Sequence, residues 1–276
     1  MNNIKILYRD ADWVDEDELD ILRDDGMFNE CQPIKYRSQV YKNDLVIGRY
    51  SVLPYYQEVE NEIKFLGAKL VNSYKQHQYV ADCTQYSEDV KDFTPKCFTT
   101  WGNLLEGSYI IKGKTNSKKM QWNNMMFCPT ADSVKDVAAR LLEDSFIGNQ
   151  GLIVRPYIPL EKLGEGINGL PISNEWRFFC LGDKIVDAGF YWAGMLDSDP
   201  LNLPSDAVRL VHKIMNIVKD KCNFYVVDVA KTASGDWICI ELNDGQMSGL
   251  SCIPPERFYY NLETSFTGID FKLFTI

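Results

Sequence analysis

The residues best suited to chemistry lie in one apolar segment near the C-terminus, residues 224–243 (FYVVDVAKTASGDWICIELN). Its alternating pattern and the dipeptide Ser234-Gly235 predict a β-hairpin with a two-residue loop. Counting outward from that loop places Asp228 opposite Glu241 on the neighbouring strand. Because side chains alternate along a strand, Asn243 lies on the same face as Glu241. The sequence therefore predicts two acids and an amide on one face of a hairpin.

Two carboxylates that face each other within apolar strands repel, so a cation is expected between them. Histidine ligands are scarce, since the chain has only His77 and His212. Oxygen ligands without His or Cys favour a hard ion, and a few carboxylates with an amide fit magnesium shared with nucleotide phosphates. The alternative is an exposed sheet face whose acids are solvated.

Cationic residues that could meet phosphates occur in two further places. Lys112 ends a strand pattern and precedes Gly113, which suits a lysine that projects from a strand edge toward a phosphate. The following polar loop, residues 113–124, could fold over phosphates as a mobile lid, and it contains Lys114, Lys118 and Lys119. The alternatives are a solvated strand end and a solvated turn.

Arg155 and Arg177 lie within apolar strand patterns, where an unpaired guanidinium would be costly. Each therefore requires an acidic or phosphate partner, and arginine binds phosphate in a fork geometry. The alternative is a structural salt bridge, for which Glu175 is a candidate partner of Arg177.

Several elements must position these residues. In the first hundred residues, a strand at 45–48, a helix at 54–65 and a strand at 68–71 form an α/β pattern. The polar stretch 82–99 predicts a link to a second unit. The remaining predicted elements are strands at 108–112 and 151–157, a helix at 132–142, a mobile loop at 162–171, a hairpin at 175–192 and a helix capped by Ser205.

Composition excludes some classes of protein. The chain has 276 residues, enough for two or three subdomains, and a net charge of −10, which argues against a nucleic-acid scaffold. The N-terminus lacks the apolar region of a signal peptide, and no run of about 18 apolar residues could span a bilayer. The eight cysteines include no CxxC pair, which favours buried reduced thiols. We therefore expect a cytoplasmic protein without nucleic-acid or membrane partners.

These residues together resemble the ATP-grasp superfamily, and in particular the clade named for two arginines and one lysine in bacteria and their phages. The most specific motif is residues 241–250 (ELNDGQMSGL), which resembles a metal-binding Glu-x-Asn followed by a glycine-containing loop. The other matching segments are residues 48–54 (GRYSVLP), 72–82 (NSYKQHQYVAD), 112–117 (KGKTNS), 154–158 (VRPYI) and 174–179 (NEWRFF).

The resemblance implies an α+β or α/β fold of three subdomains that clasp ATP. Residues 1–95 would form an N-terminal α/β subdomain, residues 96–158 an antiparallel lid, and residues 159–276 a C-terminal antiparallel-sheet core with the metal site. Two departures from the superfamily stand out in this chain. Arg155 occupies the place of a common acidic hinge residue, and Val226 that of a common arginine.

The resemblance also implies roles for individual residues. Asp228, Glu241 and Asn243 match the magnesium ligands. Lys112 matches the lid lysine that reaches the ATP phosphates, and Arg155 and Arg177 would take over anion contacts in this clade, so these three are the implied catalytic residues. The implied ATP contacts are Lys96, Lys112, Lys114, Val154, Arg155, Tyr157, Ile158, Glu161 and Arg177, with a hinge backbone at 153–158 that reads adenine and Glu161 at the ribose.

The reaction implied is ligation of a carboxylate to an amine. The small-molecule or peptide carboxylate would attack the γ-phosphate of Mg-ATP to give an acylphosphate, which the amine captures with release of ADP and phosphate. The alternatives are a small-molecule kinase and a non-catalytic protein whose acids pair with Arg155 and Arg177. Fold does not encode the substrate. Arg49 and Tyr50 are candidates for substrate contact, and the alternative is a surface arginine and a tyrosine at the edge of the core.

Overall fold

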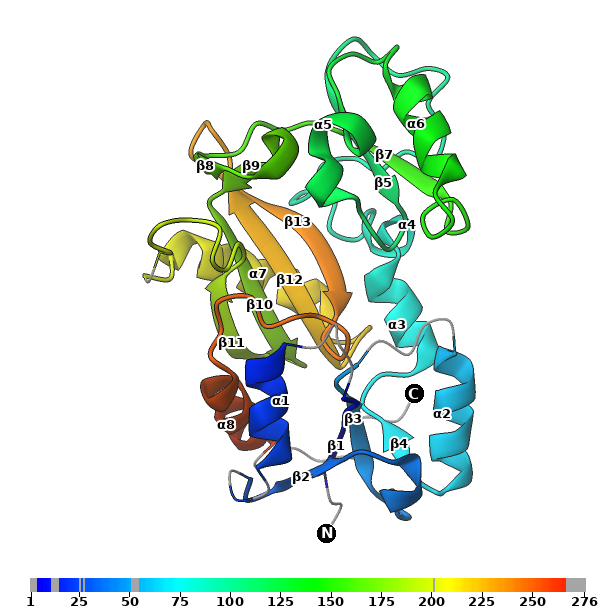
Figure 1. Cartoon of the computed structure of the whole chain (residues 1–276), viewed down its shortest axis with the longest axis vertical. Coiled ribbons are helices and arrows are strands. Elements are labelled where there is room, and N and C mark those ends of the chain that lie inside the picture. Colours follow the sequence, from blue (N-terminus) through cyan, green and yellow to red (C-terminus); the bar gives the residue numbers. More distant parts are fainter. Residues whose placement is uncertain are drawn as a thin grey trace.

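The described residues form three larger sheets stacked along the longest axis of the molecule, and a small two-stranded sheet (Figure 1). The computed structural model describes residues 4–10, 15–24, 26, 28–50, 55–200 and 202–266. A parallel sheet lies at the lower end of the view, a large antiparallel sheet in the middle, and a small antiparallel sheet at the upper end. The cleft between the upper and middle sheets contains most residues with predicted chemistry.

The lower unit is a parallel sheet in the order β2-β1-β3-β4, as its α/β pattern predicts. Its elements are β1 (Ile4–Leu7), α1 (Glu16–Arg23), β2 (Cys31–Ile34), the 3-10 turn η2 (Arg37–Gln39), β3 (Leu45–Gly48), α2 (Tyr56–Phe65) and β4 (Lys69–Leu70). The predicted strand 45–48 is confirmed, and that at 68–71 is shorter by one residue at each end. The expected start of α2 at residue 54 lies outside the described residues, as do residues 51–54 of the first matching motif.

Two helices carry the chain from this unit to the upper one: α3 (Tyr74–Ala81) and α4 (Cys83–Tyr86). Ser73 begins α3 with a capping box, because its hydroxyl accepts from the Gln76 backbone N–H while the Gln76 side chain accepts from the Ser73 N–H. Helix α4 lies at the start of the polar link predicted at residues 82–99, so this link is not a loop throughout.

The upper unit, here called the lid, is an antiparallel sheet in the order β6-β5-β7 covered by one amphipathic helix. Its elements are β5 (Tyr109–Gly113), the 3-10 turn η3 (Lys119–Gln121), α5 (Trp122–Met125), β6 (Phe127–Cys128), α6 (Val134–Glu143) and β7 (Leu152–Pro156). The apolar face predicted for α6 packs on the sheet. β5 is the central strand, and Lys112 lies next to its last residue, at the strand end that the sequence predicted.

The middle unit, here called the core sheet, is antiparallel in the order β11-β10-β12-β13. Its elements are β8 (Lys162–Glu165), the turn η4 (Ile167–Gly169), β9 (Pro171–Ser173), β10 (Glu175–Leu181), β11 (Lys184–Phe190), α7 (Ser205–Val218), β12 (Phe224–Lys231), β13 (Trp237–Asp244) and α8 (Pro255–Phe266). Helix α7 covers one face, and α8 with α1 covers the other.

Two local predictions in this unit were wrong. The segment expected to be a mobile loop, residues 162–171, contributes to a small hairpin of β8 and β9. Gly169 closes it with a φ of 76°, a conformation that glycine adopts without steric cost. The N-cap residue of α7 is Pro204, and no side chain makes a capping hydrogen bond there. Ser205, the predicted cap, is the first residue of the helix.

The lower unit shares a buried core with the core sheet. Ile6 and Leu22 belong to the same apolar cluster as Phe179, Phe224 and residues of α8. This packing fixes the lower unit against the C-terminal half of the chain, whereas the lid has an apolar core of its own. Our division at residues 95 and 158 stays a proposal.

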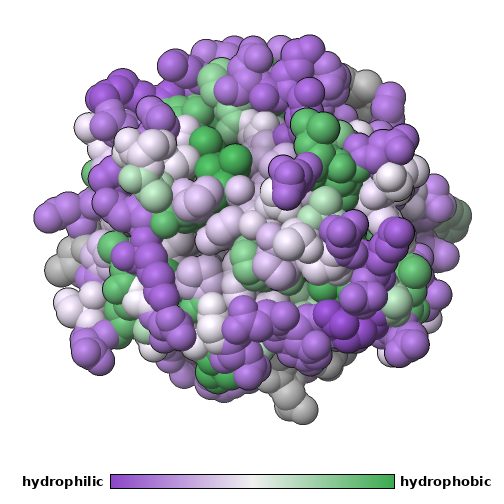
Figure 2. Space-filling view, turned by 90° about the horizontal axis from the view of Figure 1, so that it is seen from above, coloured by the Kyte–Doolittle hydropathy of each residue, from purple (hydrophilic) through white to green (hydrophobic). Residues whose placement is uncertain are grey.

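The face seen from above, at the lid end, is mostly hydrophilic (Figure 2). Hydrophobic residues form separate patches there and no single broad one. No helix in the described part of the chain is long and apolar enough to cross a membrane.

Candidate functional site

The hairpin of β12 and β13 pairs Asp228 with Glu241, as predicted. The pairing near the turn, however, differs from the count outward from a two-residue loop. That count pairs Lys231 with Ile238, whereas the structure pairs Lys231 with Trp237, a shift of one residue. A β-bulge next to Asp228 restores the predicted register. Without the bulge Asp228 would face Ile240, and Glu241 would point to the opposite face.

Asp228 is completely buried and is held by an arginine on the neighbouring strand β10. Arg177 donates from Nε to Oδ1 at 2.9 Å and from Nη2 to Oδ2 at 2.8 Å. Its Nη1 donates to the carbonyl of Gly249 at 2.9 Å. The structural salt bridge weighed for Arg177 therefore exists, but its partner is Asp228 and not Glu175.

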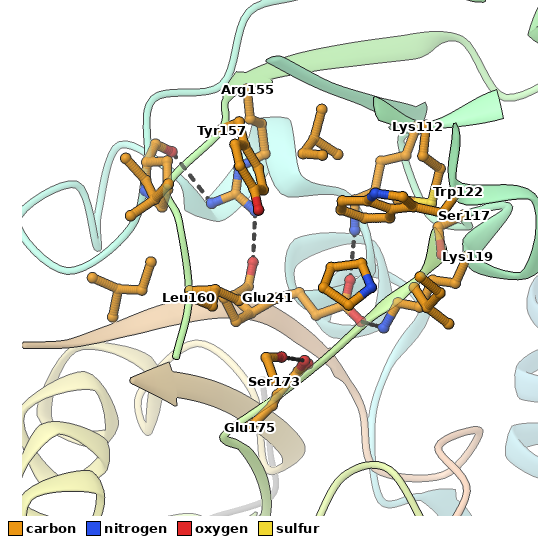
Figure 3. A pocket seen from close by; sticks show the side chains of 18 of the residues that line it. Lys112, Ser117, Lys119, Trp122, Arg155, Tyr157, Leu160, Ser173, Glu175 and Glu241 are labelled. Atoms are coloured by element: carbon orange, nitrogen blue, oxygen red, sulfur yellow. Dashed lines mark hydrogen bonds and ion pairs between the residues drawn. The ribbon is translucent and has the colours of Figure 1, made fainter. Parts of the chain in front are cut away.

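Glu241 is held by two lysines from the lid (Figure 3). Lys112 donates to Oε2 at 2.5 Å, and Lys119 lies 3.8 Å from Oε1. Burial by itself would raise the pKa of Glu241, but Lys112 and Lys119 reverse this effect and hold the pKa well below its usual range. The expectation of a cation at the acids is met by protein side chains, and the alternative of solvated acids is wrong.

A cavity of about 330 Å³ lies between the lid and the core sheet. Its walls are largely apolar and aromatic, with contributions from Trp122, Met126, Tyr157 and Ile158. Lys112, Lys119 and Glu241 converge at one place in the lining, which also includes the charged residues Arg155, Lys162 and Glu175. A largely apolar slot with charged groups in its lining suits a flat, partly apolar ligand that bears negative charge.

Arg155 lines this cavity and has no acidic partner in the described part of the chain. It is 7% exposed and donates to the carbonyl of Ile240 at 2.6 Å and to the Thr94 hydroxyl at 2.5 Å. Its Nε has no hydrogen-bond partner among the described residues. A buried guanidinium with only neutral partners favours an anion nearby.

A second cavity of about 410 Å³, here called the reaction cavity, adjoins the first. The two share Ser117, Lys119 and Glu241. The reaction cavity is otherwise lined by the loop at residues 115–121 and by Arg177, Tyr191, Asn243 and the segment 247–249. The two cavities are therefore neighbours, and their shared wall carries a lysine beside a carboxylate.

Lys119 is the residue that the sequence identified only as part of a polar loop. Its Nζ donates to the Tyr191 hydroxyl at 2.6 Å and lies 4.1 Å above that ring. Burial opposes the charge of Lys119, but Tyr191 and Glu241 hold its pKa above the usual range. The only sequence signal was a lysine placed after the small residues 115–117, because its contact with Tyr191 spans 72 positions.

Of the predicted ATP contacts, Lys112, Arg155, Tyr157, Ile158 and Arg177 line one or other of the two cavities. Four others line neither. Lys96 is exposed, Lys114 lies 3.7 Å from Asp82, Val154 is buried in the apolar core of the lid, and Glu161 accepts from Lys231 and Asn174.

Arg49 is a buried structural residue and not a surface arginine. It is 5% exposed, forms an ion pair with Glu18 at 2.8 Å and donates to the carbonyl of Gly245 at 2.6 Å. Tyr50 is also buried, beneath the guanidinium of Arg9. Neither residue lines the two cavities. The alternative of a surface arginine was therefore wrong, because Arg49 is buried.

The metal ligands implied by the resemblance differ in access. Glu241 and Asn243 line the reaction cavity, whereas Asp228 lies behind Arg177. The described residues contain no group of three or more His, Cys, Asp and Glu that could hold a metal. Magnesium that is shared with phosphates needs only one or two protein carboxylates, so Glu241 with the amide oxygen of Asn243 fits such an ion.

Glu175 is a buried acid at the cavity that is not fully satisfied. Its Oε2 accepts from the Ser173 hydroxyl at 3.2 Å, and Oε1 has no partner among the described residues. Burial raises the pKa of Glu175 to about 7, with Lys119 opposing the rise. The carboxyl group therefore changes its charge near neutral pH.

We expect Glu175→Gln to remove a pH-dependent loss of stability. A group whose pKa is raised on folding stabilises the protein below its unfolded pKa, and this contribution is lost as pH rises through the folded value. Between about pH 5.5 and pH 8, the free energy of unfolding of the wild type should fall by roughly 2 kcal/mol more than that of Glu175→Gln. Urea unfolding across this range is the measurement, and parallel profiles would contradict the assignment.

Comparison with known proteins identifies the class that this fold and site define, which is the ATP-grasp fold. The family described as an ATP-grasp domain, family 3 of the clade named for two arginines and one lysine, matches residues 100–262, which is more than half of the chain. The chain belongs to this family. The sequence prediction of this ATP-grasp clade is thereby confirmed.

Solved structures support the same fold. A D-alanine–D-alanine ligase from Bacillus anthracis in complex with ATP has a TM-score of 0.61 at 12% identity, covering 97% of this chain and 98% of that one. A RimK domain ATP-grasp protein from Sphaerobacter thermophilus DSM 20745 has a TM-score of 0.57 at 11% identity, and the match covers 94% of this chain and 99% of that one. D-cycloserine synthetase DcsG has a TM-score of 0.58 at 12% identity, and the match covers 95% of this chain and 99% of that one. No curated protein matches the chain.

Proposed function

We propose that this chain is an ATP-dependent carboxylate–amine ligase that works through an acylphosphate. The observation that supports this most is the pair of neighbouring cavities, one apolar slot and one polar space. Lys119 and Glu241 line both of them, and Lys112 donates to Glu241. The neighbours of known structure include a D-alanine–D-alanine ligase, and this chain belongs to an ATP-grasp family.

In the proposed complex, the adenine occupies the apolar slot beside the lid–core connection at Tyr157 and Ile158. The N–H of Tyr157 already donates to the carbonyl of Ser108 at 2.9 Å. No backbone hydrogen bond engages Ile158 in the described part of the chain, so its N–H and carbonyl are free for the adenine edge. Trp122 supplies an aromatic wall on the lid side.

The phosphates then lie where the cavities meet. Lys112 and Lys119 supply positive charge from the lid, and Arg155 supplies a guanidinium without an acidic partner among the described residues. Glu241 and Asn243 would hold magnesium, which neutralises phosphate charge when it is bound. Since phosphoryl transfer depends mainly on positioning and charge neutralisation, these groups suffice without a catalytic His or Cys.

The carboxylate substrate would bind in the reaction cavity. There Arg177 is stacked on the Tyr191 ring, with its guanidinium carbon 4.7 Å from the ring centroid, and both residues face the space that contains Asn243. An oxygen of the substrate carboxylate attacks the γ-phosphorus, the bond to the β-phosphate oxygen breaks, and ADP leaves. The amine then attacks the acyl carbon and displaces phosphate. Lys119 lines both cavities, and Tyr191 and Glu241 raise its pKa, so its positive charge is available to ATP and to the acylphosphate.

The test of this proposal is product analysis with Mg-ATP, a panel of amino acids and dipeptides, and hydroxylamine as the amine. We expect ADP and phosphate, together with a hydroxamate that forms only in the presence of a carboxylate of the panel. AMP and pyrophosphate would overturn the mechanism even if ATP binds. A stable phosphorylated product that hydroxylamine does not intercept would identify a kinase instead.

One observation favours a second candidate, a non-catalytic binding protein. In that alternative the acids pair with arginines, and Asp228 does pair with Arg177. Glu241, however, pairs with lysines of the lid and borders an open space. Titration calorimetry with Mg-ATP distinguishes the two, because the absence of nucleotide binding would leave only the non-catalytic alternative.

A further inference from the structure

A third large cavity lies on the other side of the lid loop from the reaction cavity. Its volume is about 690 Å³, and it is formed between α3 and the lid segments 115–116 and 145–150. Thr115 and Asn116 line both this cavity and the reaction cavity. A chain-like ligand that crosses these two residues would therefore reach the reaction cavity. We call this space the α3–lid cavity.

The lining of the α3–lid cavity is dominated by uncharged hydrogen-bonding groups. Five carboxamide side chains face it: Gln78, Gln85, Asn116, Asn149 and Gln150. Hydroxyl groups of Thr115 and Ser145 add to this set. A carboxamide both donates and accepts hydrogen bonds, so it matches the N–H and C=O of a peptide bond.

Charged groups play little part in this lining. Asp82 is already engaged, because it accepts from the Thr84 N–H and hydroxyl and lies 3.7 Å from Lys114. Lys75 is exposed at the rim. The α3–lid cavity is therefore unlike the reaction cavity, whose lining includes the cations Arg177 and Lys119. A ligand with a neutral body and an anionic end fits the two cavities together.

Two of the carboxamides are free to bind. Among the described residues, the side chains of Gln78 and Gln85 make no hydrogen bond, and both residues are exposed. Beside them, Phe146 is 59% exposed on the lid turn, an apolar surface that a side chain of the ligand can cover.

The aromatic rings favour a peptide over a saccharide. Saccharides commonly use open aromatic faces, but both tyrosine rings here are occupied by protein. Tyr74 stacks with His77, their ring centroids 6.2 Å apart, while Lys221 lies over the ring of Tyr79, whose hydroxyl donates to Asp89. Of the described residues that line the cavity, only Phe146 offers an exposed ring.

We propose that the α3–lid cavity binds the uncharged backbone of a peptide, whose terminal carboxylate extends past Thr115 and Asn116 into the reaction cavity. The binding of a peptide is independent of the proposed function, whereas the placement of its carboxylate for reaction rests on it. The carboxamides of Gln78 and Gln85 would pair with peptide bonds on the α3 side, and Phe146 would contact a side chain.

The test is affinity selection in the absence of nucleotide. The full-length protein is incubated with an equimolar library of tetrapeptides blocked by acetyl and amide groups, and in parallel with malto- and chito-oligosaccharides. Bound molecules are separated by gel filtration and identified by mass spectrometry. We expect peptides to be retained and oligosaccharides not. Retention of no peptide, or of oligosaccharides only, would overturn the proposal.

Variants locate the binding. The double variant Gln78→Leu/Gln85→Leu should weaken binding of the selected peptides by about tenfold or more, because two hydrogen-bond partners are lost. Leucine suits exposed helix positions, so the melting temperature should change little. The matched control is Gln57→Leu, an exposed glutamine on α2 that lines no cavity described above. Equal binding by the double variant and the control would place the peptide elsewhere and sink the idea.

A final measurement separates this proposal from the proposed function. The selected peptide with a free carboxylate is supplied with Mg-ATP and hydroxylamine. Hydroxamate formation with a KM that rises in the double variant, at an unchanged kcat, supports both proposals. Binding without ADP formation would retain the peptide site and reject its carboxylate as the reacting group.

Discussion

Glu241→Gln should reduce formation of both ADP and hydroxamate by about 100-fold to 1000-fold. Glutamine has nearly the shape of glutamate but no charge, and Glu241 lies where the two cavities meet, within 3.8 Å of both Lys112 and Lys119. The proposed magnesium ion would lose its only cavity-lining carboxylate among its implied ligands, and the two lysines would lose their counter-charge. Both changes disturb the position of the γ-phosphate.

Thermal unfolding measures the binding side of the same prediction. Mg-ATP at about 100 times its dissociation constant should stabilise the wild type by about 2.7 kcal/mol. In Glu241→Gln the part of this shift that depends on magnesium should disappear. The control is Glu60→Gln. Glu60 is a buried glutamate of the lower unit that forms an ion pair with Lys64 at 2.7 Å, and it lines neither of the two cavities. An undiminished magnesium-dependent shift in Glu241→Gln would refute the metal assignment.

The second large effect concerns stability. Arg177→Met should lower the free energy of unfolding by about 3 to 5 kcal/mol, because Asp228 would remain completely buried without its partner. The double variant Arg177→Met/Asp228→Asn should be more stable than the sum of the single losses allows, since it removes the uncompensated charge. Urea unfolding of the wild type, both single variants and the double variant measures this coupling.

A second arginine–aspartate pair, between Arg257 of α8 and Asp187 of β11, is a matched control. Arg257 also makes two hydrogen bonds to one aspartate, Asp187, at 2.9 and 2.8 Å, but the Arg257 side chain is 50% exposed. Arg257→Met should cost less than Arg177→Met, because water can still reach that pair. Equal losses in the two variants, or strictly additive effects in the cycle, would show that burial of Asp228 does not set the cost.

The local patterns of the sequence were sufficient for some elements, but no prediction covered β1, α1, β2, α3 or α8. Apolar runs bounded by turn residues identified β3 at its observed ends, and the hairpin of β12 and β13 with Asp228 facing Glu241. The family resemblance was confirmed by the match over residues 100–262. These features depend on period, turn chemistry and residue order, all of which are present in short stretches of chain.

The pairing of charged groups was decided by the tertiary structure. Lys112 and Glu241 are 129 residues apart, and Arg177 and Asp228 are 51 residues apart. An acidic chain offers many carboxylates to each cation, and no local pattern selects among them. Burial decides instead, because only the partner brought close by the fold can compensate a desolvated charge. For the same reason Lys119 was indistinguishable in sequence from the solvated lysines of its loop.

The bulge in the hairpin of β12 and β13 shows the same division between local and tertiary information. Period and loop length placed Asp228 opposite Glu241, yet the observed ladder is shifted by one residue near the turn and corrected by the bulge. A one-residue slip would move Glu241 to the opposite face, among the apolar contacts beneath α7. The sequence by itself determined that two acids and an amide lie on this hairpin. Only the packing of α7, the lid and β10 around it decided which groups neutralise them, because neutralisation depends on distances that the order of residues does not encode.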